Sequence, residues 1–96
     1  MEAKRENAIE RLFCKRVSEA GGLALKFTSP SYRGVPDRLV LFKGKAFFAE
    51  IKRPGEQLRK LQQYRKAEFA SYGFSVATID SEDAVDRFIH QIRNSI

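Results

Sequence analysis

The sequence is poor in the side chains that build disulfides, zinc sites and histidine-dependent catalytic pairs, with one cysteine and one histidine among 96 residues. Cys14 has no second cysteine with which to form an internal disulfide, and one thiol cannot build a zinc site. A Cys–His or Ser–His catalytic pair would have to use His90. Since His90 falls in a predicted helix near the C-terminus, an exposed histidine close to the end of that helix is the simpler interpretation.

Long apolar runs are also missing. The longest, residues 39–42 and 46–49, are far shorter than the roughly 20 residues that a membrane helix requires. The mixed charges of residues 2–6 predict that no secretory signal peptide opens the chain. Together with the lone cysteine, these absences predict a reducing, cytoplasmic setting.

The chain is short and basic. Its 96 residues predict one domain, residues 1–96, with room for a single core. There are 18 lysines and arginines against 12 aspartates and glutamates, which gives a net charge of +6. Six of the basic residues lie between positions 52 and 66 with Glu56 as the one acidic residue there, whereas residues 80–96 are net acidic. This distribution favours nucleic acid as the partner, although a solubilising surface has the same composition.

Hydrophobic periodicity predicts an α/β fold with the element order αβββαβα. The expected helices are 3–20, 57–72 and a last one that Ser81 caps and that ends near Arg93, and the expected strands are 23–27, 38–42, 46–52 and 74–79. Residues 38–42 and 46–52 form a hairpin, and its second strand is apolar on both faces, as in a central strand. The strand–helix–strand unit over 46–79 predicts a parallel crossover. The result is a mixed sheet of about four strands flanked by helices on both faces.

Three charged residues interrupt this apolar hairpin. Glu50 and Lys52 share one face of the second strand, and Asp37 opens the first. A two-residue turn at Lys43-Gly44 would place Asp37 directly opposite Glu50, whereas a bulged turn would shift the register by one residue. Two opposed carboxylates repel each other unless a divalent cation lies between them. The structural alternatives are a charge pair that protects a sheet edge and a turn cap at Asp37.

Polar residues also interrupt the apolar stripes of two predicted helices. On a helical wheel for residues 57–72, Gln62 and Arg65 fall inside the stripe, whereas Lys66 falls outside it. Gln62 either hydrogen-bonds a catalytic side chain or a metal-bound water, or lies at the margin with its amide in solvent. Glu6 and Glu10 border the apolar face of the first helix. Each is either a third carboxylate for a metal site or a charge that compensates the helix dipole.

The sequences Gly34-Val35-Pro36-Asp37-Arg38 and Phe48-Ala49-Glu50-Ile51-Lys52 resemble the motif of the PD-(D/E)XK nucleases. With Arg53-Pro54-Gly55 next and a glutamine in the following helix, the pattern is similar to the VRR-NUC branch, which includes stand-alone viral and bacterial domains. The resemblance covers roughly residues 6–80 and implies a restriction-endonuclease-like fold. The chain departs from it at Lys43-Gly44-Lys45, and at Arg59-Lys60, where the start of the helix is left open.

The resemblance implies a role for each motif residue. Asp37, Glu50 and the Ile51 carbonyl would ligate Mg²⁺ or Mn²⁺. Glu10 matches the carboxylate of the first helix, with Glu6 as second choice. Lys52 would orient or deprotonate the attacking water, or stabilise developing charge, and Gln62 matches the glutamine of the following helix.

The function implied is a metal-dependent DNA endonuclease, in a bacterial or virus-infected cell, that leaves 5′-phosphate and 3′-hydroxyl ends. The residues expected to contact DNA are Lys26, Tyr32 (as a stacking residue), Arg33, Arg53, Arg59, Lys60 and Lys66. A two-fold homodimer acting on branched DNA such as a Holliday junction is the expected assembly. The alternatives are a basic α/β module that binds nucleic acid without cleaving it, and a structural or partner-binding protein.

Overall fold

The computed structural model describes residues 2–95, and side chains from residue 8 onward. The elements are α1 (Glu2–Glu19), β1 (Leu23–Lys26), β2 (Arg38–Phe42), β3 (Lys45–Ile51), α2 (Lys60–Ser71), β4 (Val76–Ile79) and α3 (Glu82–Arg93). The predicted order αβββαβα is therefore confirmed. In the described part of the chain, no helix is both long and apolar enough to span a membrane.

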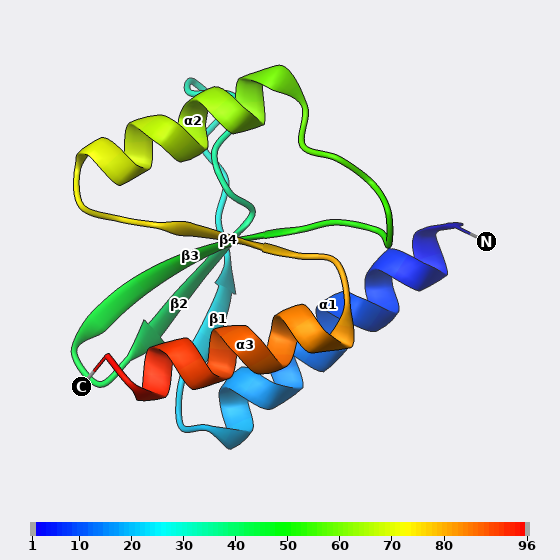
Figure 1. The fold of residues 1–96 in the computed structure, drawn as a ribbon, viewed down its shortest axis with the longest axis vertical. Coiled ribbons are helices and arrows are strands. Elements are labelled where there is room, and N and C mark those ends of the chain that lie inside the picture. The colour runs from blue at the N-terminus through cyan, green and yellow to red at the C-terminus, as the bar shows by residue number, and fades with distance from the viewer. Residues whose placement is uncertain (1, 96) are drawn as a thin grey trace.

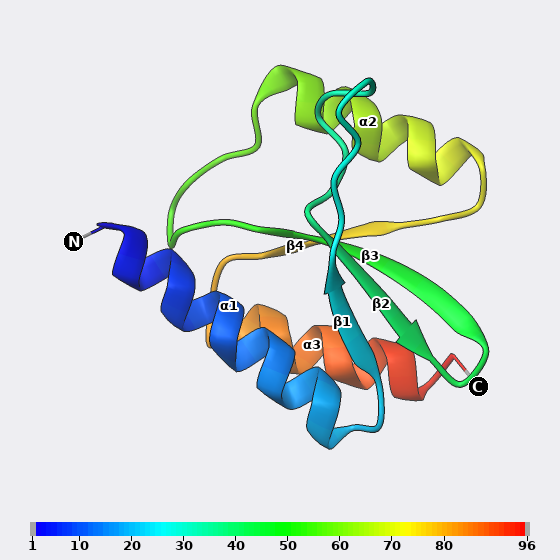
Figure 2. The same ribbon diagram turned by 180° about the vertical axis from the view of Figure 1, so that it is seen from behind.

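The strands form one mixed sheet in the order β1-β2-β3-β4. β2 pairs with β1 and with β3 in antiparallel fashion, and β4 pairs with β3 in parallel. Helices α1 and α3 cover one face of the sheet and α2 lies on the opposite side (Figure 1), as the view from behind also shows (Figure 2). β3 is an inner strand, as its apolar sequence predicted.

The main core lies between the sheet and the helices α1 and α3. Phe47, Ala49 and Ile51 alternate along β3 toward this face, because successive side chains of a strand point to opposite sides. The Phe88 ring of α3 contacts Phe13 of α1 at a centroid distance of 5.1 Å and Phe47 at 6.3 Å. The fully or nearly buried residues of this core are Phe13, Val17, Val40, Phe42, Ala49, Ile51, Ile79, Ala84, Val85, Phe88 and Ile92.

The layer on the α2 side is thinner and aromatic. Phe48 of β3 packs against Phe69 of α2, and its ring also contacts Phe27 and Phe74 at centroid distances of 5.6 and 5.7 Å. No residue of α2 is fully buried. The apolar stripe predicted for this helix includes Leu61 and Tyr72, and the prediction that these two residues are buried is wrong, because they are 42% and 77% exposed. The helix packs only on the small aromatic cluster around Phe48.

The β2–β3 hairpin has the register that a two-residue turn predicts. Phe42 pairs with Lys45, and the ladder continues to Arg38 opposite Ala49. The turn residues Lys43 and Gly44 both have positive φ, 48° and 79°, as in the type I′ turn that matches the twist of the strands. The bulged alternative is therefore wrong. One position beyond the last pair, Asp37 and Glu50 reach the same end of the hairpin and the face that α2 covers.

Local capping signals set two other helix ends. α1 ends where Gly21 takes a left-handed conformation, with Gly21 N bonded to Ser18 O and Gly22 N to Val17 O. α3 begins after Ser81, whose Oγ accepts a hydrogen bond from Ala84 N at 3.1 Å. The start of α2 is different, because it comes at Lys60 rather than at residue 57. The side chain that fixes this start belongs to the candidate active site.

Candidate active site

Asp37 and Glu50 lie together at the end of the β2–β3 hairpin. Asp37 Oδ1 accepts a hydrogen bond from Ile51 N at 3.1 Å. This bond holds the aspartate beside Ile51, the last residue of β3. Glu50 is 6% exposed. Both carboxylates line a cavity of about 440 Å³. The other residues that line it are Arg33, Gly34, Val35, Arg59, Leu61 and Gln62.

The electrostatics of this pair favour a positive partner. Burial and the neighbouring Asp37 carboxylate raise the pKa of Glu50 to about 7, against the opposing effect of Lys52 and Arg59. Burial, and to a lesser degree the Glu10 carboxylate, raise the pKa of Asp37. Two neighbouring carboxyl groups that both hold protons more tightly than usual are stabilised when a cation neutralises them.

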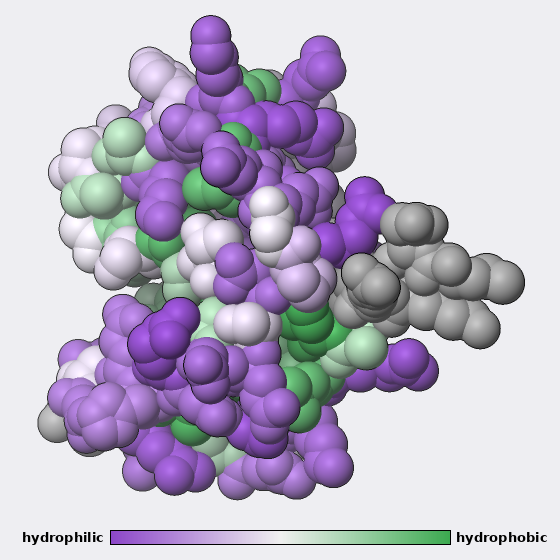
Figure 3. All heavy atoms as spheres, turned by 45° about the vertical axis from the view of Figure 1, so that its right-hand side comes forward, coloured by the Kyte–Doolittle hydropathy of each residue, from purple (hydrophilic) through white to green (hydrophobic). Residues whose placement is uncertain are grey.

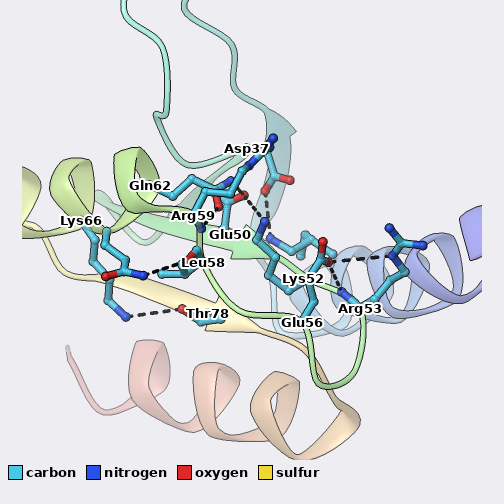
Figure 4. A network of polar contacts seen from close by, with 12 residues as sticks. Asp37, Glu50, Lys52, Arg53, Glu56, Leu58, Arg59, Gln62, Lys66 and Thr78 are labelled. Atoms are coloured by element: carbon cyan, nitrogen blue, oxygen red, sulfur yellow. Dashed lines mark hydrogen bonds and ion pairs between the residues drawn. The ribbon is translucent and has the colours of Figure 1, made fainter.

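Lys52 follows β3 and points toward the same place. Its Nζ lies 4.0 Å from Glu50 Oε2, and the two side chains are 6% and 8% exposed. Lys52 N donates to Ile79 O at 2.8 Å, so β4 fixes the backbone at this position. A buried ammonium group is thus held beside a buried carboxylate (Figure 4).

Gln62 contacts the site from α2, on the α2 face of the sheet. Its Nε2 donates to Glu50 Oε2 at 2.8 Å and its Oε1 accepts from Arg59 N at 3.0 Å. Of the two interpretations that the sequence left open, the inward one agrees with this geometry. The same contact explains the late start of α2, because the Gln62 side chain satisfies a backbone N–H that the first helical turn leaves unpaired.

Glu10, the expected third carboxylate, forms an ion pair with Arg38. Its Oε2 accepts from the Arg38 guanidinium at 2.6 Å. Arg38 is 9% exposed, and among the described side chains its Nε finds no hydrogen-bond partner. Within the described residues, no group of three or more His, Cys, Asp or Glu side chains could hold a metal ion. The Glu6 side chain lies outside the described part, and metal ligation by Glu10 stays a prediction.

The donor set of the cavity fits a hard divalent cation. Asp37 and Glu50 offer carboxylate oxygens, and none of the described residues that line the cavity offers a sulfur or imidazole ligand. Oxygen donors of this kind suit Mg²⁺ and Mn²⁺ rather than zinc or copper. The fit rests on the two carboxylates, and the Ile51 carbonyl remains an expected third ligand.

The structure gathers some of the expected DNA-binding residues around this cavity and separates others from it. Arg33 and Arg59 line the cavity itself, and Lys60 follows as the first residue of α2. Arg53 lies 3.9 Å from Glu56 in an ion pair on the turn after β3. Lys26 is exposed on the edge strand β1, opposite Arg38 in the ladder.

Lys66 and Tyr32 are both engaged with other parts of the chain. Lys66 Nζ donates to Thr78 Oγ1 of β4 at 3.4 Å, so the Lys66 side chain faces the sheet. The prediction that Lys66 lies outside the inward-facing stripe of α2 is therefore wrong. The Tyr32 hydroxyl donates to Glu68, and the Arg65 guanidinium lies 3.9 Å from the centroid of the Tyr32 ring. No function was predicted for Arg65, although its position inside the apolar stripe of α2 indicated a side chain that contacts other parts of the chain.

Comparison with known proteins adds two similarities. No protein-family model matches the chain. Over 80 residues the chain is 45% identical to the protein named "Putative nuclease p44" of Acyrthosiphon pisum secondary endosymbiont phage 1, covering 82% of this chain and 86% of that protein. A solved structure of a VRR_NUC domain superimposes with a TM-score of 0.82 and 27% identity, covering 90% of this chain and 95% of that one.

The mixed sheet and its Asp–Glu-x-Lys arrangement define a domain of the PD-(D/E)XK nuclease class. Within that class the chain belongs to the VRR-NUC family. The resemblance stated from the motifs around Asp37 and Glu50 is thereby confirmed.

Proposed function

We propose that residues 1–96 form a single metal-dependent endonuclease domain that hydrolyses phosphodiester bonds of DNA. The observation that carries the proposal is the buried Asp37–Glu50 pair at the wall of a cavity that arginine side chains also line. Lys52 and Gln62 both contact Glu50. A purely structural acidic pair has no need of a cavity. A binding module has no need of a buried lysine at 4.0 Å from one of the carboxylates.

Each residue has a task in the proposed reaction. Asp37 and Glu50 hold Mg²⁺ or Mn²⁺, which supplies charge neutralisation at the phosphate when bound. Gln62 fixes the orientation of the Glu50 carboxylate through its 2.8 Å hydrogen bond. Lys52 either orients or deprotonates the attacking water, or donates to the phosphate oxygen on which charge develops and so stabilises the transition state. In-line attack of water forms a new bond between its oxygen and phosphorus and breaks the bond between phosphorus and O3′. The water releases a proton and O3′ takes one up from solvent, so 5′-phosphate and 3′-hydroxyl ends result.

The basic residues around the cavity bind the DNA backbone. Arg33 and Arg59 lie at the cavity, and Lys60 lies next to Arg59. Phosphate contacts of this kind do not depend on sequence and weaken steeply with salt. In Figure 3, hydrophilic residues cover both the upper end, formed by α2, and the lower end, formed by α1 and α3, and hydrophobic residues show mainly in the band between them. The phosphate-binding surface is assigned to the upper end.

We further propose a two-fold homodimer that acts on branched DNA such as a Holliday junction. A chain of 11.0 kDa with one site cuts one strand. Symmetric cleavage of a branched molecule needs two sites, and a two-fold dimer provides both with one interface type. Sedimentation as a monomer at micromolar concentration would contradict the proposed dimer but not the proposed hydrolysis.

Incubation with DNA tests the activity directly. The chain is mixed with linear duplex or four-way junction DNA in Mg²⁺, in Mn²⁺ or in EDTA. We expect cleavage in either metal, none in EDTA, and a preference for the junction. Asp37→Asn should abolish cleavage, whereas Glu56→Gln, which changes an exposed carboxylate outside the cavity, should not. Binding without cleavage under every condition would instead assign the chain to the non-catalytic nucleic-acid-binding modules.

A further inference from the structure

Tyr64 presents an exposed aromatic ring beside the candidate active site. It lies on α2 one helical turn after Leu61, which lines the cavity. Residues three apart on a helix share a face. Tyr64 is 63% exposed and Leu61 is 42% exposed. An apolar surface therefore adjoins the cavity.

The ring is also held in place. The Arg65 guanidinium carbon lies 3.9 Å from the centroid of Tyr32 and 5.4 Å from that of Tyr64. Arg65 is itself fixed, because its Nε donates to Arg33 O at 2.8 Å and its Nη1 contacts Glu68 at 3.4 Å. Tyr32, Arg65 and Tyr64 thus make an ordered cluster of two rings about one guanidinium.

Within this cluster Tyr64 is the ring available to a ligand. Tyr32, the stacking residue expected from the sequence, gives its hydroxyl to Glu68 and its ring to Arg65. Tyr64 has the longer distance to Arg65 and the larger exposed fraction, 63% against 41% for Tyr32. Three basic residues lie near it: Arg33 and Arg59 at the cavity, and Lys60 one turn earlier on α2. The acidic Glu68, one turn later, is already paired with Arg65 and with the Tyr32 hydroxyl. That setting suits a ligand that carries both phosphate and a flat apolar face, which is a nucleotide.

We propose that Tyr64, with Leu61 beside it, is a stacking platform for an unpaired nucleobase of the DNA whose phosphate lies in the cavity. This inference rests on the proposed nuclease function and names its substrate class. Base faces are covered in a continuous duplex and free at gaps, flaps and branch points. Stacking on an aromatic ring tolerates any base. The platform therefore selects DNA with an unpaired base next to the phosphate in the cavity, without sequence preference.

A binding experiment in EDTA separates the platform from the cleavage chemistry. The probes are a fully paired duplex and the same duplex with a single-stranded gap, each with 2-aminopurine at the gap position. Tyr64→Ala should weaken binding to the gapped DNA about 5- to 150-fold, the range for loss of one stacked base, and leave duplex binding unchanged. Tyr64→Phe should retain the affinity. Tyr72→Ala is the matched control, because Tyr72 is a 77% exposed tyrosine at the far end of the same helix.

The fluorescence gives an independent readout. Wild type and Tyr64→Phe should quench 2-aminopurine in the gapped DNA, and Tyr64→Ala should not. Equal losses of Tyr64→Ala on both DNAs, or an equal effect of Tyr72→Ala, would overturn the platform. Failure of the proposed function looks different: the gap-dependent binding would persist, and no DNA would be cleaved in Mg²⁺ or Mn²⁺.

Discussion

Gln62 joins α2 to Glu50 through a 2.8 Å hydrogen bond while its other amide atom, Oε1, accepts from Arg59 N. One side chain thus satisfies the start of a helix and orients a buried carboxylate at the end of a strand. Residues 57–59 stay outside the helix, and this places the first turn of α2 over the cavity. The position of the helix and the orientation of the carboxylate therefore depend on each other.

This double contact predicts a specific effect of Gln62→Ala. Loss of the contact to Glu50 should reduce Mn²⁺ affinity and cleavage about 10- to 100-fold, as expected for a residue that orients a metal ligand. Stability should fall by about 0.5–1.5 kcal/mol because a helix-start hydrogen bond is lost. Calorimetric titration with Mn²⁺ and urea unfolding measure the two effects.

Gln63→Ala is the control for this substitution. Gln63 also bonds the start of α2, since its Nε2 donates to Leu58 O at 2.8 Å, but it does not contact Glu50. It should lose a similar stability and retain the metal affinity. Equal Mn²⁺ affinities in the two variants would contradict the role assigned to Gln62.

The raised pKa of Glu50 predicts a stability that falls as pH rises. Burial and Asp37 raise this pKa from 4.5 in the unfolded chain to about 7 in the folded chain. Between these values the folded state binds the proton more tightly, so the free energy of unfolding decreases from about pH 4.5 to about pH 7 and then levels off. The contribution is on the order of 3 kcal/mol. Urea unfolding in EDTA across this range measures it.

Glu50→Gln should remove most of this decrease. A smaller decrease of the same sign should remain, because the pKa of Asp37 is raised as well. Glu56→Gln is the control: the pKa of Glu56 is lowered, chiefly by its hydrogen bond from Arg53 N, so its loss cannot flatten the profile. If the wild-type stability rose between pH 5 and 7, and the Glu50→Gln variant showed the same profile, burial and the charge of Asp37 would not raise the pKa of Glu50.

Lys52→Ala should slow cleavage at least about 10²- to 10³-fold and leave DNA binding intact. Lys52 is 5% exposed and its Nζ faces Glu50 rather than the surface, so it contributes little to phosphate attraction. Loss of a single donor to transition-state charge typically costs about 10²- to 10³-fold in rate. Single-turnover cleavage in Mg²⁺ and fluorescence anisotropy in EDTA separate the two properties.

Lys45→Ala is the matched control because Lys45 begins the same strand at its other end, where its Nζ donates to Ser95 O. It should cleave at the wild-type rate. Full activity of Lys52→Ala in a folded chain would remove Lys52 from the mechanism.

The parts of the fold that the sequence predicted are those set by local rules. Lys43-Gly44 determined the hairpin register and hence the approach of Asp37 to Glu50. Ser81 marked the start of α3, and the apolar residues on both faces of β3 identified an inner strand. These features can be read from the sequence because turn, capping and strand preferences depend on residues that are close together in the chain.

The remainder depended on contacts between distant segments. A helical wheel shows which side chains of α2 share a face, but it does not show which other element each face contacts. Lys66 was therefore predicted to point away from the sheet, although it contacts Thr78 of β4. Tyr32 was expected to stack on DNA. The partners of its side chain, Arg65 and Glu68, lie over 30 residues away in the sequence, so no local pattern indicates them. The ion pair of Glu10 with Arg38 was not predicted either, because these two residues are also far apart in the sequence.

The placement of the basic residues predicts which of them set the salt dependence of DNA binding. Arg59 lines the cavity, and the exposed Lys60 follows it as the first residue of α2. Alanine at each should therefore weaken binding and lower the slope of log affinity against log salt by about 1. Arg53→Ala should have a smaller effect, because Glu56 lies 3.9 Å away and already offsets its charge. Arg87 of α3, exposed on the opposite side of the sheet, is the control. If Arg87→Ala lowered the slope as much as Arg59→Ala, the DNA would bind across α3, and the surface around the Asp37–Glu50 cavity would no longer be its site.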